Sequence, residues 1–212
     1  MKPDDWDIQT DWGGDEEIDH LLLRSRAEKR VLKNTEVHLS KAKALSDLCE
    51  TPKEGEQYRI ITEKQFNAYA LILHVIGNDV IEEMHLAIYR INQPTVTSII
   101  DLINSHRIKK ATFVISSFFN QTKKPEQWAI TLRDFCDEND RCTHIYTHNH
   151  AKVLAVKTEK GDHFVFEGSG NMSDNARIEQ YLYENNRQSY EFHKGWMKDL
   201  ITDEKQTHGI SA

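Results

Sequence analysis

The sequence predicts an α/β domain in which a mixed, largely parallel sheet is flanked by helices. From residue 55 onward, short apolar strand patterns alternate with amphipathic helical patterns, as in sheets that are covered on both faces. The segment Ala111-Thr-Phe-Val-Ile-Ser116 is largely apolar, which is typical of a strand buried on both sides. Prolines at positions 94 and 125 each open a helical pattern.

The elements of the first half follow from turn signals and apolar spacing. A Pro-to-Gly segment at 52–55 separates this domain from the preceding residues, and the apolar run after it predicts a strand. Thr62 is a suitable N-cap for the next helix. Pro94 begins a second helix with apolar side chains at helical spacing. We therefore expect strands at 58–61, 83–90 and 111–116 and helices at 62–76 and 94–106.

The second half adds a helix, a hairpin, a further strand and a terminal helix. Residues 144–158 have the pattern of one long strand. The segment Glu159-Lys-Gly-Asp162 then turns the chain into an antiparallel partner. We therefore expect strands at 144–158, 163–167 and 180–183 and helices at 125–137 and 190–200.

The residues before this domain differ from it in charge. Residues 4–19 contain eight carboxylates and no lysine or arginine. We expect a disordered acidic tail, in which Trp6 and Trp12 could form a docking motif for a protein partner. Asp15 is a suitable N-cap for a helical arm. The predicted organisation is a tail at 1–14, a helical arm at 15–54, the α/β domain at 55–205 and a short tail at 206–212.

Composition narrows the class of protein. Mean hydropathy is −0.66, and no apolar run approaches the ~20 residues of a membrane span, so no membrane insertion is expected. The N-terminus lacks the apolar core of a secretory signal, and the three cysteines have no disulfide-like spacing, which favours the cytoplasm. The net charge of −7 argues against coating nucleic acid by bulk charge, but not against a nuclease with a local basic cleft.

Two short motifs contain the residue types that a phosphodiester-cleaving site needs. The first is His150-Ala151-Lys152, in which the histidine and lysine share one face of the predicted strand. The second is Gly168-Ser169-Gly170-Asn171, a small-residue loop whose backbone amides can approach an anion. A histidine can attack phosphorus, while a lysine and an amide can hold its non-bridging oxygens.

Further residues complete the predicted site. Glu179 follows Asn171 by eight positions and can hydrogen-bond the imidazole of His150, which would fix its tautomer. No metal site is predicted, because the cysteines and histidines match no zinc-finger spacing. The predicted catalytic residues are His150, Lys152, Asn171 and Glu179, and the predicted substrate-binding residues are Gly168, Ser169, Gly170 and His148.

The order His-x-Lys followed by Gly-Ser-x-Asn resembles the phospholipase D superfamily, and the resemblance covers roughly residues 55–205. It implies a phospholipase D-like fold and a phosphohistidine intermediate, formed by one histidine while a second protonates the leaving oxygen. It implies no metal and no other cofactor. Because the chain has one copy of the motif, it is similar to single-motif members that form homodimers, such as small bacterial endonucleases.

Two features depart from the family pattern: the hairpin between Lys157 and Gly168 is longer, and one position of the motif differs. The family has an aspartate five residues after the lysine, where this chain has Lys157, although Asp162 in the predicted turn could partly substitute. The tyrosyl-DNA phosphodiesterases also lack that aspartate. We expect a metal-independent phosphodiesterase, with a homodimer and nucleic acid as partners, because lipid enzymes of the superfamily usually carry two motifs in one chain. The alternatives are a catalytically weak nucleic-acid- or phosphate-binding regulatory module and a lipid head-group phosphotransferase.

Overall fold

The computed structural model describes residues 33–39, 45, 49–63, 67–120, 125–173 and 178–207. Their strands form one eight-stranded mixed sheet in the order β1-β2-β8-β7-β6-β3-β4-β5. The pairs β1–β2, β3–β4 and β4–β5 are parallel, and the other neighbours are antiparallel. The strands are β1 Lys33–Leu39, β2 Glu56–Glu63, β3 Ile81–Ile88, β4 Ile108–Ser116, β5 Cys142–Thr147, β6 Val153–Thr158, β7 His163–Gly168 and β8 Ile178–Asn185.

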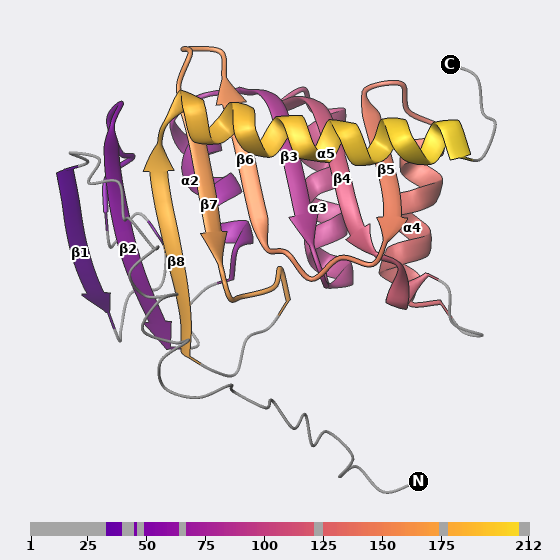
Figure 1. Ribbon diagram of the computed structural model, residues 1–212, viewed down its shortest axis with the longest axis horizontal. Coiled ribbons are helices and arrows are strands. Elements are labelled where there is room, and N and C mark those ends of the chain that lie inside the picture. The colour runs from indigo at the N-terminus through magenta and orange to yellow at the C-terminus, as the bar shows by residue number, and fades with distance from the viewer. Residues whose placement is uncertain are drawn as a thin grey trace, which may run out of the picture. The chain divides into compact units, whose positions relative to one another are not determined.

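Helices cover the sheet on both sides (Figure 1). Helix α5 crosses one face, and α2, α3 and α4 lie against the other. The predicted mixed sheet flanked by helices is therefore confirmed, although three rather than most of its seven neighbouring pairs are parallel. Among the described residues, no helix has the length and apolar character that crossing a membrane requires. The helices are α2 Tyr69–Asn78, α3 Gln93–Asn104, α4 Gln127–Asp137 and α5 Arg187–Thr207, and a short 3-10 turn η2 spans Ser117–Phe119.

The larger hydrophobic core lies on the α2–α4 face of the sheet. It includes Leu71 and Ile72 of α2 and Phe113 of β4, all fully buried. A smaller core on the opposite face packs Met197 of α5 against Ala87 of β3. Both faces of the central strands are covered by packed side chains. Polar side chains of a functional site can therefore gather at the edge of the sheet where these strands end.

One predicted strand proves to be two. Residues 144–158 do not run continuously, because β5 ends at Thr147 and β6 begins at Val153. Strand β5 pairs with β4, whereas β6 pairs with β3 on the other side. The connection 148–152 therefore passes along the ends of β4 and β3 (Figure 1). The residues predicted to lie on a strand face are instead in this connection.

The prediction of a helical arm at 15–54 is wrong over Lys33–Leu39, which forms strand β1 and pairs in parallel with β2. The sequence there alternates polar residues with Thr35, Val37 and Leu39, a period of two that favours a strand. The predicted acidic tail at 1–14 lies outside the described residues, as do most of the remaining arm and of the tail at 206–212.

A polar network joins α5 to β3 under the helix. The carboxylate of Glu83 accepts hydrogen bonds from Tyr190 Oη at 2.9 Å and Lys194 Nζ at 2.5 Å. It also lies 3.4 Å from Nε2 of His85. Burial lowers the pKa of His85 to about 4, although the neighbouring Glu83 opposes this shift. His85 is therefore held neutral inside the fold.

We expect the free energy of unfolding to decrease as the pH falls from 6.5 to about 4. In this window the unfolded chain takes up a proton at His85 that the folded chain does not, so acid favours unfolding. The effect amounts to at most roughly 3 kcal/mol. Urea unfolding at several pH values should show a smaller slope for His85→Gln, because glutamine can donate to Glu83 but does not titrate. Equal slopes in the two proteins would contradict this role.

Candidate active site

The candidate catalytic residues gather at one edge of the sheet. Strands β3, β4 and β5 end at this edge, β6 begins there and β7 ends there (Figure 1). The connection 148–152 leads into β6, and residues 169–173 leave β7. Carboxyl ends of parallel strands are the usual location of ligand sites in α/β sheets.

Asn149 fixes the connection that holds the first motif. Its Nδ2 donates to the carbonyl oxygens of Ile88 at 3.2 Å and Val114 at 2.8 Å. Its Oδ1 accepts from the backbone N–H of Ala151 at 2.8 Å. The side chain thus ties the segment to β3 and β4 on one side and shapes its own turn on the other. No pattern in the sequence indicates this role for Asn149.

The ammonium of Lys152 lies against the imidazole of His150. Its Nζ is 3.0 Å from Nδ1 and 3.4 Å from Nε2, and it donates to the His150 carbonyl at 2.8 Å. An ammonium has only donors, so a ring nitrogen that binds it accepts the hydrogen bond through its lone pair. Burial lowers the pKa of Lys152, and the charge of Glu179 opposes that shift.

Tyr89 forms an aromatic wall beside this pair. Its ring centroid is 4.8 Å from that of His150, and Nζ of Lys152 is 5.5 Å from the same ring, within range of a cation–π interaction. The sequence predicts Tyr89 inside a strand at 83–90, so this contact was not expected. No pattern within that strand indicates the contact, because it depends on the pairing of β3 with β6.

Backbone hydrogen bonds bring the second motif to the same place. The N–H of Gly168 donates to the carbonyl of Lys152 at 3.1 Å, and the N–H of Met172 donates to the carbonyl of Arg90 at 3.2 Å. Oδ1 of Asn171 accepts from the Arg90 N–H at 3.2 Å. The two motifs, eighteen residues apart from His150 to Gly168, are therefore adjacent, with Tyr89 and Arg90 between them.

Gly168 is required by the close approach of β8. A Cβ atom at this position would lie 2.3 Å from Cδ1 of Tyr181 and 2.4 Å from the backbone oxygen of Gln180. Any larger residue would force the two strands apart. Strand packing therefore explains this glycine, and the predicted role of Gly168 in substrate binding stays a prediction. Gly170 is buried, whereas Ser169 and His148 are exposed at the same edge.

Glu179 makes a different contact from the predicted one. Its carboxylate accepts a hydrogen bond from Oγ of Ser169, and the same Oγ accepts from the backbone N–H of Gln180 at 3.1 Å. Glu179 thus stabilises the loop that carries Asn171. The predicted hydrogen bond from His150 to Glu179 stays a prediction.

Lys157 and Asp162, the two positions considered for the family's aspartate, lie away from the edge of the sheet that carries the candidate site. Lys157 lies near the far end of β6, where it pairs with Glu82 at 2.8 Å. Asp162 lies in the β6–β7 turn and accepts a hydrogen bond from Nδ2 of Asn185 at 2.8 Å. Because β6 separates both side chains from Lys152, Asp162 does not replace the missing carboxylate at the site.

Side chains of metal-ligand type do not group here. Cys136 and Cys142 are buried free thiols on α4 and β5. Within the described ranges, no three side chains of His, Cys, Asp or Glu are arranged to hold a metal ion.

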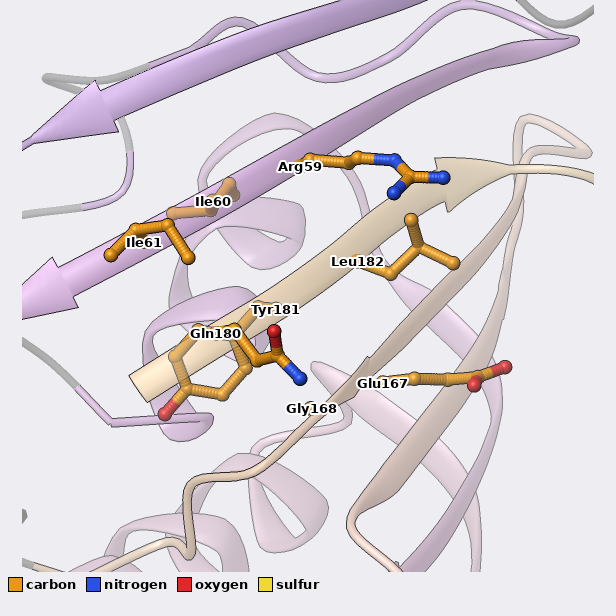
Figure 2. Close-up of a pocket in the computed structure, with 8 residues that line it drawn as sticks. All are labelled: Arg59, Ile60, Ile61, Glu167, Gly168, Gln180, Tyr181 and Leu182. Atoms are coloured by element: carbon orange, nitrogen blue, oxygen red, sulfur yellow. The ribbon is translucent and has the colours of Figure 1, made fainter. Parts of the chain in front are cut away.

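A pocket of about 630 Å³ lies beside the candidate site, on the face of β2, β8 and β7 (Figure 2). It borders the second motif through Gly168, whereas His150 and Lys152 do not line it. One wall is Glu167, whose Oε1 is 2.6 Å from Nε2 of His193 on α5. The lining residues are Arg59, Ile60, Ile61, Glu167, Gly168, Gln180, Tyr181 and Leu182.

The sequence matches no protein-family model and no curated protein. The structure is similar to polyphosphate kinase from Porphyromonas gingivalis, with a TM-score of 0.51 and 13% identity over 70% of this chain and 26% of the kinase. It also matches Nuc, a phospholipase D family member from Salmonella typhimurium, with a TM-score of 0.49 and 14% identity over 68% of this chain and 93% of Nuc. Yeast tyrosyl-DNA phosphodiesterase gives a TM-score of 0.36 and 13% identity over 59% of this chain and 31% of that enzyme.

The chain therefore has a phospholipase D-like fold, as the order of its motifs predicts. It spans about a quarter of the length of the polyphosphate kinase.

Proposed function

We propose that the protein is a metal-independent phosphodiesterase that acts through a phosphohistidine intermediate and cleaves nucleic acid as a homodimer. The convergence of His150, Lys152 and Asn171 on one sheet edge supports this proposal. The neutral imidazole is the nucleophile. The ammonium and the amide are donors for the non-bridging phosphate oxygens, on which charge develops in the transition state.

In the proposed reaction, a ring nitrogen of His150 attacks phosphorus and the bond from phosphorus to the leaving oxygen breaks. A second histidine donates a proton to that oxygen. The same histidine then takes a proton from water, which attacks the phosphohistidine and releases His150. In the structure, the ammonium of Lys152 lies 3.0 Å from Nδ1 of the His150 ring. It must exchange this contact for a phosphate oxygen when substrate binds.

The proposed dimer rests on the number of motif histidines that the reaction needs. The reaction uses two, and the chain carries a single His-x-Lys motif followed by Gly-Ser-x-Asn. We propose that a second copy of the chain supplies the second His150. Nucleic acid is the proposed polymer because lipid enzymes of the superfamily usually carry two motifs in one chain.

An activity panel tests the proposal. Plasmid DNA, single-stranded DNA, RNA and a lipid diester are each incubated with the protein, with and without EDTA. We expect nucleic acid to be cleaved at a rate that EDTA does not change, because Lys152 and Asn171 serve as the charge stabilisers. Cleavage of the lipid diester alone would assign a head-group phosphotransferase, and binding without turnover would assign a regulatory module. Loss of activity on chelation, restored by magnesium or zinc, would contradict the mechanism.

A further inference from the structure

An exposed phenylalanine extends the aromatic wall at the site. Phe118 follows β4 in the turn η2, and the residue is 61% exposed. Its ring centroid lies 6.5 Å from that of Tyr89, with the planes inclined by 26°. Tyr89 in turn contacts His150. Three rings therefore run from solvent to the proposed nucleophile.

The turn holds Phe118 in place although the ring faces water. The N–H of Phe118 lies 3.4 Å from Oγ of Ser116, which caps the turn. Phe119 is buried and packs edge-on against Phe118, with ring centroids 5.1 Å apart. Phe119 is itself packed against Trp128 at 5.3 Å. An apolar ring positioned in this way beside a polar site is available to a flat ligand without further ordering.

We infer that Phe118, backed by Tyr89, is a stacking platform for an unpaired base next to the scissile phosphate, which makes single-stranded nucleic acid the preferred substrate. This inference rests on the proposed function. Every base has a face that can stack on an aromatic ring, so such a platform tolerates any sequence. In a duplex those faces are already stacked on neighbouring bases.

The distribution of exposed apolar groups favours a base over an acyl chain or a protein surface. Those partners need a contiguous apolar patch of a few hundred Å². Among the described residues, the other large exposed apolar side chains belong to other elements. Ile178 begins β8, four places from β4 in the sheet order. Leu73 lies on α2, and Phe192 and Leu200 lie on α5.

Binding to matched oligonucleotides tests the platform. Fluorescence anisotropy is measured in a His150→Asn background, which prevents cleavage, with single-stranded DNA and with an equally long strand that is abasic throughout. Phe118→Ala should weaken binding of the base-containing strand about 5- to 150-fold, the range for one stacked base. Binding of the abasic strand should not change. Phe118→Trp should retain the preference for bases.

Phe192→Ala is the matched control, because Phe192 is 68% exposed but lies on α5. It should affect neither strand. An unchanged affinity in Phe118→Ala, or an equal loss for both strands, overturns the inference. Loss of the dimer in Phe118→Ala by analytical ultracentrifugation would overturn it too, since the ring would then be a contact between copies.

Turnover by the protein with His150 intact is measured separately. Cleavage without base-dependent binding leaves the proposed function standing and removes the platform. Base-dependent binding without any cleavage leaves the platform standing and removes the proposed function.

Discussion

Replacement of His150 by alanine is expected to abolish phosphodiester turnover while leaving the fold intact. The side chain is exposed and lies in a connection rather than in the core, so its removal leaves no cavity. The backbone of the connection is held by Asn149, which the substitution does not touch. His150→Asn should be equally inactive, because an amide cannot form the phosphohistidine intermediate. Initial rates and thermal denaturation of each variant check the two halves of this expectation.

The charge-stabilising residues should give smaller losses. Lys152→Met keeps the length of the side chain and removes its charge, and removal of one such donor typically lowers kcat by about 10²–10³-fold. Asn171→Asp keeps the oxygen that accepts from Arg90 N–H but places a negative charge beside the phosphate. It should therefore lose activity without loosening the loop.

His163→Ala is the control for a general effect of losing a histidine. His163 begins β7, at the opposite end of that strand from Gly168. This variant should keep its activity. Near-normal turnover in His150→Ala would show that another residue is the nucleophile. Incorporation of labelled phosphate into His150→Ala would show the same.

The fold and the two motifs could be predicted because their signals are local. Alternating apolar segments and the prolines at the starts of α3 and α4 need only neighbouring residues to be interpreted. That the motifs of His150 and Gly168 lie side by side could also be predicted from the sequence. A short hairpin joins them, and antiparallel neighbours with a tight turn must pair.

The remaining features depend on contacts that are distant in sequence. The break between β5 and β6 accompanies their pairing with different strands, β4 and β3, and Asn149 holds the connection through hydrogen bonds to residues 61 and 35 positions away. The partner of Glu179 depends on where β8 places it relative to Ser169. The contact between Tyr89 and His150 depends on the order in which β3 and β6 pair. No pattern within one segment contains this information.

Mixed dimers provide the most direct test of the shared site. We expect the chain to be a two-fold dimer in solution, with an interface of well over ~1,000 Å² if association is obligate. Each active centre would contain the two copies of His150. One imidazole must be neutral to attack and the other protonated to donate, so the rate should depend on pH with a bell shape that belongs to the pair.

A dimer that contains one wild-type subunit and one His150→Ala subunit should therefore be almost inactive. It retains either a nucleophile or an acid but not both. If the subunits exchange at random, activity should fall as the square of the wild-type fraction rather than in proportion to it. Mixing wild type with His163→Ala should leave activity unchanged, which controls for dilution and exchange. A linear fall with His150→Ala, with subunit exchange verified by native mass spectrometry, would mean that each subunit works alone. Full activity in a protein that light scattering shows to be monomeric would mean the same.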